Sequence, residues 1–257
     1  MSESVDLRRE LRNDVLWLTI DRQQRRNAIN QAVLDGIARG FAQAQADRAI
    51  RAIVLTGAGE KAFCAGGDLQ TSDPFVLDHS NPYAAAAELF REARRLPVPL
   101  IARVNGACYA GGMGLMAMCD LAVAHTGARF ALPEVKVGVF PAQVIAVLRQ
   151  LLPRRVLNHM CLTGEPISAS QALELNLVNA IGEDVDVVLD DLLRQLRAAS
   201  PAAMRRGLYM LNRIESMPFE EAISFAEGQI ALLALTDDAK EGVAAFAEKR
   251  TPLWTGR

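Results

Sequence analysis

Strand-like segments alternate with helix-like segments over most of this chain, and this alternation is the feature that most restricts its fold. The apolar segments 15–20, 53–56 and 100–104 have the length and composition of buried strands. The intervening segments carry helical periodicity, as in the helix that Asn30 is predicted to cap. Ser168 with Gln171 predicts a capping box at the start of a later helix, and Thr236 is predicted to cap the last one. Alternation up to about residue 180 predicts an α/β fold, and the helical segments after about residue 200 predict a separate small module.

The composition narrows the possible classes of protein. Of the 257 residues 51% are apolar, which is ample for a core, and a net charge of −2 gives no reason to expect nucleic acid as a partner. The four cysteines form no CxxC pair and show no metal-ligand spacing, so we expect no metal. The N-terminus lacks an apolar signal core, and the uncharged run at 104–119 is too short to span a bilayer. We therefore expect a cytoplasmic protein that does not enter the membrane.

Two glycine-rich loops each follow a predicted strand: "AFCAGGDL" (62–69) and "YAGGMG" (109–114). Small residues allow a ligand to reach backbone amides, and two N–H groups that converge on one oxygen form an oxyanion hole. A helix that begins near Gly112 would add its positive end to such a site. One loop alone is most simply a tight turn. The two loops together favour a site that stabilises an enolate or a tetrahedral intermediate.

The second loop also fits a weaker pattern. The stretch "GMGLMA" (112–117) satisfies G-x-G-x-x-[GA], and an acidic residue, Glu134, lies 20 residues after Gly114. In a dinucleotide-binding unit the strand runs directly into the first glycine. Here the strand ends near Val104 and "NGACYAG" intervenes, so NAD binding is a disfavoured alternative.

Glu134 lies in "FALPEVKVG", where Pro133 fixes the preceding backbone and most neighbours are apolar. A carboxylate desolvated in such a pocket has a raised pKa and can transfer protons near neutral pH. The simpler interpretation is a solvated glutamate at the end of a strand, and spacing alone does not exclude it.

Over nearly its whole length the chain resembles the crotonase superfamily, also called the enoyl-CoA hydratase/isomerase family. The resemblance rests on several motifs in the same order: "QQRRNAI" (23–29), "KAFCAGGDL" (61–69), "NGACYAGGMGLMAMCDLAVA" (105–124), "ARFALPEVKVGVFP" (128–141), "LTGEPISASQALELNLVN" (162–179) and "DAKEGVAAFAEKR" (238–250). It implies a spiral core of strand–strand–helix repeats over 1–198 and a helical trimerisation region over 199–257, in a homotrimer or a hexamer built as a dimer of trimers. The implied substrates are acyl-CoA thioesters, so coenzyme A is part of the substrate and no separate cofactor is expected.

The resemblance also implies roles for individual residues. Gly67 and Gly111 would donate backbone N–H groups to the thioester oxygen, and Glu134 would be the acid/base at Cα. The remaining substrate contacts would come from Ala62, Ala65, Asp68 and Leu69 along the coenzyme arm and acyl entrance, Arg25 and Arg26 near the coenzyme phosphates, Gly114 and Pro133 in the site, and Phe246 and Lys249 on coenzyme A, within one subunit or across a subunit boundary.

The chain departs from the family pattern at Gly114. The best-known hydratases carry a second glutamate there, and this chain has no carboxylate at 113–116. Two glutamates together hold and split one water, whereas isomerases of the family use a single carboxylate that removes a proton from Cα and returns one at Cγ. Hydroxycinnamoyl-CoA hydratase-lyases also keep only the second glutamate, so hydration stays open.

Several other polar residues are candidates to replace the missing carboxylate in activating water. They are Asp73, Asp78, His79 and Tyr83 in the variable segment 71–83, and Gln143, which can orient a water but cannot take its proton. Ala142 occupies the position where dehalogenases of the family place a nucleophilic aspartate, so aryl displacement is not expected. We predict an enzyme that hydrates a nonstandard 2-enoyl-CoA. The alternatives are an enoyl-CoA double-bond isomerase that uses Glu134 alone, and a non-catalytic acyl-CoA binding protein.

Overall fold

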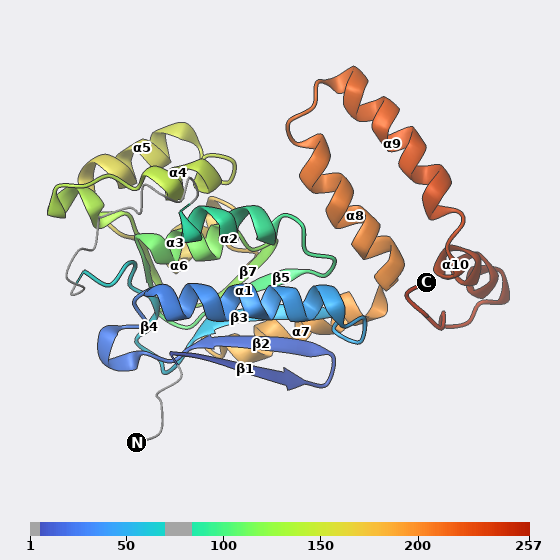
Figure 1. Ribbon diagram of the computed structural model, residues 1–257, viewed down its shortest axis with the longest axis horizontal. Coiled ribbons are helices and arrows are strands. Elements are labelled where there is room, and N and C mark those ends of the chain that lie inside the picture. The colour runs from blue at the N-terminus through green and yellow to red at the C-terminus, as the bar shows by residue number, and fades with distance from the viewer. Residues whose placement is uncertain (1–5, 70–83) are drawn as a thin grey trace.

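The computed structural model of the chain describes residues 6–69 and 84–257, which form two β-sheets, surrounding helices and a C-terminal arm of helices (Figure 1). The candidate residues Asp73, Asp78, His79 and Tyr83 lie outside the described residues.

The larger sheet has the strand order β1-β2-β3-β5-β7-β10. β1 and β2 pair as an antiparallel hairpin, and each of the other neighbouring pairs is parallel. Every residue of β3 is buried, as expected for a parallel strand covered on both faces. The strands are β1 (Leu7–Arg12), β2 (Val15–Ile20), β3 (Ala52–Gly57), β5 (Leu100–Val104), β7 (Leu121–His125) and β10 (Ala180–Gly182).

The smaller sheet has the order β4-β6-β8-β9, with β4 (Ala62–Cys64), β6 (Ala107–Tyr109), β8 (Arg129–Ala131) and β9 (Ile167–Ser168). Three times in succession the chain places one strand in the larger sheet and the next in the smaller sheet, and then enters a helix. The predicted α/β spiral of strand–strand–helix repeats is therefore confirmed.

Two strands differ from the sequence-based prediction. The segment 62–69 was predicted as a loop, but its first three residues form β4, which is too short to show a periodic pattern. β1 was not predicted because it is polar. It is an edge strand, and five of its six residues are exposed.

The helices of the core cover the sheets, and those of the arm follow one another at the C-terminus. Two short 3₁₀ helices, η1 (Gln23–Arg25) and η2 (Pro133–Val137), lie in loops near the predicted site. The α-helices are α1 (Gln31–Ala46), α2 (Ala85–Ala93), α3 (Gly111–Ala117), α4 (Ala142–Leu148), α5 (Arg154–Thr163), α6 (Ala169–Glu174), α7 (Val185–Ala198), α8 (Pro201–Ile214), α9 (Phe219–Leu233) and α10 (Asp237–Glu248).

Three predicted helix starts are confirmed. The side chain of Asn30 accepts a hydrogen bond from the Val33 amide and caps α1. Ser168 forms a capping box with Gln171 at the start of α6, and Thr236 caps α10.

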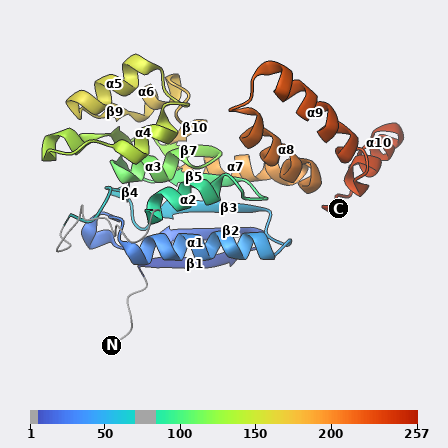
Figure 2. The same cartoon turned by 45° about the horizontal axis from the view of Figure 1, so that its top comes forward.

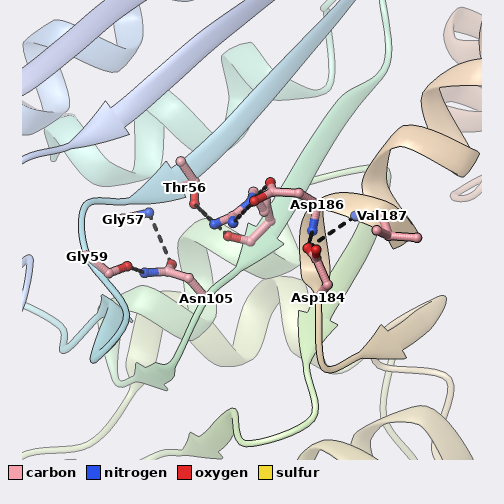
Figure 3. Close-up of polar contacts among 8 residues, drawn as sticks. Thr56, Gly57, Gly59, Asn105, Asp184, Asp186 and Val187 are labelled. Atoms are coloured by element: carbon pink, nitrogen blue, oxygen red, sulfur yellow. Dashed lines mark hydrogen bonds and ion pairs between the residues drawn. The ribbon is translucent and has the colours of Figure 1, made fainter.

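Polar side chains fix the ends of β3 and β5, from which the chain leads toward the two glycine loops (Figure 3). Asn105 donates to the Gly59 carbonyl and accepts from the Gly57 amide. Next to it, Arg103 donates to both carboxylate oxygens of Asp186, at 2.6 and 2.7 Å, and so ties β5 to α7. The loop that follows β3 and the turn that follows β5 are thereby held together.

The arm α8–α10 lies beside the core rather than on it (Figures 1 and 2). The arm is held together by the buried Asp238 carboxylate of α10, which accepts hydrogen bonds from the Ser200 hydroxyl at 2.7 Å and from the Thr255 and Gly256 amides. Its apolar side chains are largely exposed, including Phe219, Ile230, Leu235, Val243, Phe246 and Leu253. The predicted domain boundary at 198/199 falls between α7 and α8 and remains a prediction.

In the parts of the chain that the structure describes, no helix combines the length and the apolar character needed to cross a bilayer.

Candidate active site

A cavity of about 650 Å³ is bounded by both glycine loops, by η2 and by the start of α1. Gly67 of the first loop, Gly111 of the second and Glu134 of η2 all line it. These three residues are predicted to carry the chemistry. They are far apart in the sequence, and the fold brings them to the same cavity.

The two glycine loops lie next to each other because β4 and β6, which lead into them, pair in parallel. A Cβ atom built on Gly111 would lie 3.6 Å from the amide nitrogen of Gly67. A Cβ built on Gly66, which has φ +101°, would lie 3.3 Å from the Gly111 nitrogen and only 2.6 Å from the Ala110 Cβ. Gly66 is thus required by both its conformation and its neighbours, and its absence of a side chain allows the two amides to approach.

Ala110 has a strained backbone, with φ 51° and ψ −122°, directly before Gly111. Its amide donates to the Ala131 carbonyl at 3.0 Å, which holds this conformation against β8. Gly111 is the first residue of α3, a position whose N–H has no acceptor within the helix. The strained residue therefore orients, at the positive end of a helix, an N–H that no backbone carbonyl of residues 6–69 and 84–257 accepts. The sequence carries no signal for this, because an alanine at that position looks unremarkable.

The segment before α1 supports the first glycine loop. The Ile29 amide donates to the Gly66 carbonyl at 2.7 Å, and the Asp68 amide donates to the Ile29 carbonyl at 2.9 Å. These two hydrogen bonds form a parallel β-bridge between Ile29 and Gly67. No backbone hydrogen bond from the Gly67 amide is found within residues 6–69 and 84–257, so this N–H can serve a ligand.

Asp68 lines the cavity, as the resemblance implies, and its carboxylate is also bound by an arginine side chain. Arg22 donates to it at 2.8 Å, and both side chains are about nine-tenths buried. Arg22 also donates to the Ala28 carbonyl at 2.6 Å. No role was predicted for Arg22, which lies directly before the "QQRRNAI" motif.

Glu134 is the second residue of η2, with Pro133 before it and Gly138 closing the turn behind it. Its Oε2 atom is buried and has no hydrogen-bond partner among the described residues. Burial raises the pKa of Glu134 above its usual value, opposed in part by a hydrogen bond from its own backbone. A desolvated carboxyl group with one unpaired oxygen, on the same cavity as Gly67 and Gly111, is suited to take a proton from a bound molecule and to return it.

The other predicted contact residues fall into two groups. Ala65, Leu69 and Pro133 line the cavity with Asp68. The rest are not among the residues that line it: Arg25 and Arg26 are exposed at η1, Ala62 is buried in β4, Gly114 is buried in α3, and Phe246 and Lys249 lie on and just after α10. Their roles remain predictions.

Two further sequence expectations concern the surroundings. Gln143 and Ala142 are exposed on α4 and are not among the residues that line the cavity. The stretch "GMGLMA" begins inside α3, after its first residue, and not in a turn between strand and helix. The turn that a dinucleotide-binding unit needs, with a strand running directly into the first glycine, is not found at this stretch.

Comparison with known proteins agrees with this geometry. The model of the family described as enoyl-CoA hydratase/isomerase matches residues 10–257. The chain is 32% identical to (E)-benzylidenesuccinyl-CoA hydratase of Thauera aromatica, over 96% of this chain and 98% of that protein. It is 33% identical to carnitinyl-CoA dehydratase of Escherichia coli K12 over the full length of both. The structure of an enoyl-CoA hydratase of Mycobacterium smegmatis superposes with a TM-score of 0.91, at 34% identity and with 97% and 98% of the two chains covered.

The chain belongs to the enoyl-CoA hydratase/isomerase family, whose members act on acyl-CoA thioesters. It is an enzyme of that family.

Proposed function

We propose that this protein interconverts a nonstandard 2-enoyl-CoA thioester and its hydrated product, by adding water to the double bond or by removing it. The acyl group of this thioester is branched or bulky. The observation that carries the proposal is the buried, unpartnered Oε2 of Glu134 on the wall of a cavity shared with Gly67 and Gly111. The direction of the chemistry is supported by the two relatives reported above, which are named a hydratase and a dehydratase.

The proposed mechanism uses one oxyanion site and one carboxylate. The thioester oxygen accepts hydrogen bonds from the Gly67 and Gly111 amides, which stabilise the negative charge that develops when the double bond is attacked. Glu134 takes a proton from the water whose oxygen bonds to Cβ. It then delivers that proton to Cα of the enolate, so one water is consumed and Glu134 returns to its starting state. Because the pKa of Glu134 is raised, both transfers are feasible near neutral pH.

Double-bond isomerisation is the second candidate, and Gly114 is the observation that favours it. This residue is buried in α3, where the family's best-known hydratases would place another carboxylate. With Glu134 alone, a proton removed from Cα is returned at Cγ and no water is needed. The same oxyanion site stabilises the dienolate.

We also propose that the arm builds a homotrimer or a dimer of trimers, which supplies the remaining coenzyme contacts. Large apolar side chains on α9 and α10 are exposed in the single chain, with Phe246 at 87% exposure. Both views show α10 at the end of the arm, away from α3 (Figures 1 and 2). Phe246 and Lys249 would therefore reach coenzyme A in a neighbouring subunit, while Arg25 and Arg26 would lie near its phosphates. Light scattering of the purified chain tests this assembly, and a monomer would contradict it.

The reaction is tested by incubating the protein with paired 2-enoyl- and 3-enoyl-CoA thioesters that carry straight, branched and aryl groups. Absorbance of the conjugated thioester and the product mass are followed. Loss of conjugation with the gain of one water supports hydration. Conversion of the 3-enoyl to the 2-enoyl form without water supports isomerisation instead. No product across the panel would contradict both.

A further inference from the structure

Gly114 faces a filled space, unlike Gly67 of the proposed oxyanion site. A Cβ atom built on Gly114 would lie 2.8 Å from Cζ of Phe90 and 3.2 Å from Cγ2 of Val144. Carbon atoms in contact prefer about 3.5–4.0 Å. A Cβ on Gly67, in contrast, would meet no described atom within 4 Å. The tip of the Phe90 ring from α2 and a methyl group from α4 therefore occupy the place of a side chain at 114.

The reason for glycine at 114 is space rather than backbone conformation. Gly114 lies inside α3 and does not have the positive φ that favours glycine. Glycine in a helix is less stable than alanine, so its presence has to be offset by something else. Phe90 packs against the main hydrophobic core, and its ring is held there between α2 and α3. The aromatic ring and the glycine thus form a complementary pair.

Position 114 is close to the proposed chemistry. Gly111 and Gly114 are three positions apart in one helix, so they lie on similar sides of it. A carboxylate at 114 would extend one turn beyond the amide that is proposed to bind the thioester oxygen. The space that such a side chain needs is the space that Phe90 and Val144 fill.

We propose that Phe90 keeps a second acid/base carboxylate out of position 114. Its ring fills the space that a side chain at position 114 would need, and so leaves Glu134 as the carboxylate that α3 and η2 present to the cavity. Phe90 is a specificity-determining residue that acts through position 114, not a catalytic residue. The consequence for the reaction rests on the function proposed above, whereas the packing pair itself does not.

A thermal-unfolding cycle tests the packing without any substrate. Gly114→Ala should lower the melting temperature by about 2–10 °C in the natural background, because the added methyl group overlaps the ring. In a Phe90→Ala background the same substitution should leave the melting temperature unchanged or raise it. Gly228→Ala is the matched control, since this helical glycine on α9 has no described atom within 4 Å of a built Cβ. Its effect should be the same in both backgrounds.

Equal losses from Gly114→Ala with and without the Phe90 ring would overturn the proposal. If coupling is found and the natural protein converts no enoyl-CoA, the proposed function fails and the assignment of Phe90 as the residue that fills position 114 stands. The two failures are therefore distinguishable.

A second experiment measures the consequence for the reaction. Gly114→Glu alone should lose stability and gain no hydration activity. Combined with Phe90→Ala, the glutamate should raise the hydration rate of a straight-chain 2-enoyl-CoA by about tenfold or more over the Phe90→Ala/Gly114→Gln protein. Glutamine matches glutamate in size but transfers no proton, so equal rates for the two double variants would contradict the proposed role of Phe90.

Discussion

The two halves of the candidate site are built in opposite ways. The oxyanion half is made of backbone and is heavily constrained, by the Ile29–Gly67 bridge, the close approach at Gly66 and the strained Ala110. The acid/base half is one side chain, Glu134, whose Oε2 has no hydrogen-bond partner in the part of the chain that the structure describes. The first half depends on shape and the second on desolvation. The comparison teaches that substitutions should damage the two halves with different signatures: those in the loops should lower stability, and that of Glu134 should lower turnover without lowering stability.

The largest effect is expected from Glu134→Gln. Glutamine keeps the shape of the side chain but cannot transfer a proton, so kcat/KM for the best enoyl-CoA should fall by about 10²- to 10⁴-fold. Binding of the hydroxyacyl-CoA product, measured by calorimetry, should change little because the oxyanion half is intact.

Glu165→Gln is the matched control for that substitution. Glu165 is an exposed glutamate near the same segment, where it pairs with Lys136 at 2.8 Å. Its replacement should leave kcat/KM within about twofold, as expected for the loss of a surface ion pair. If both glutamines reduce turnover alike, the special role of Glu134 is wrong.

The next effect concerns the oxyanion half and compares two adjacent glycines. Gly66→Ala forces a methyl group to within 2.6 Å of the Ala110 Cβ at a φ of +101°, so it should destabilise the fold by about 1–3 kcal/mol. Gly67→Ala has open space and should change the free energy of unfolding much less. Chemical denaturation of the two variants measures this difference. Equal losses would show that the approach of the two loops is not the constraint we describe.

The smallest effect is a dependence of stability on pH that separates the two halves. Burial raises the pKa of Glu134, so the folded protein binds its proton more tightly than the unfolded chain does. The stability of the natural protein should therefore fall as pH rises from the ordinary glutamate pKa through the raised value. Glu134→Gln has no charge to desolvate and should unfold at a higher temperature than the natural protein near neutral pH.

That difference should disappear below the ordinary pKa of glutamate, where the carboxyl group is neutral in both states. The Gly66→Ala deficit should persist at every pH, since it has a steric origin. A Glu134→Gln protein that is less stable than the natural one at neutral pH would argue against desolvation as the cause of the shift.

Much of this molecule was predictable from its sequence, because most of its signals are local. The buried strands at 15–20 and 100–104 were predicted with the bounds found, and the caps at Asn30, Ser168 and Thr236 depend only on a side chain and the next three residues. The motif resemblance also selected Gly67, Gly111 and Glu134, which the fold brings to one cavity.

The features that were missed depend on contacts between distant segments. The strain at Ala110 follows from its hydrogen bond to Ala131 and its contact with Gly66, and no pattern in the neighbouring residues encodes it. The ring of Phe90 against Gly114 joins two helices, so the sequence showed a missing carboxylate but not what fills its place.

Deuterium incorporation at Cα tests the central claim most directly. The natural protein and its Glu134→Gln variant are incubated in D₂O with the most reactive enoyl-CoA from the panel, and the recovered thioesters are analysed by mass spectrometry and NMR. One deuterium at Cα with the natural protein, and none above background with the variant, is the result that a single-carboxylate enolate mechanism predicts. Equal incorporation by both proteins, or none by either, would contradict it.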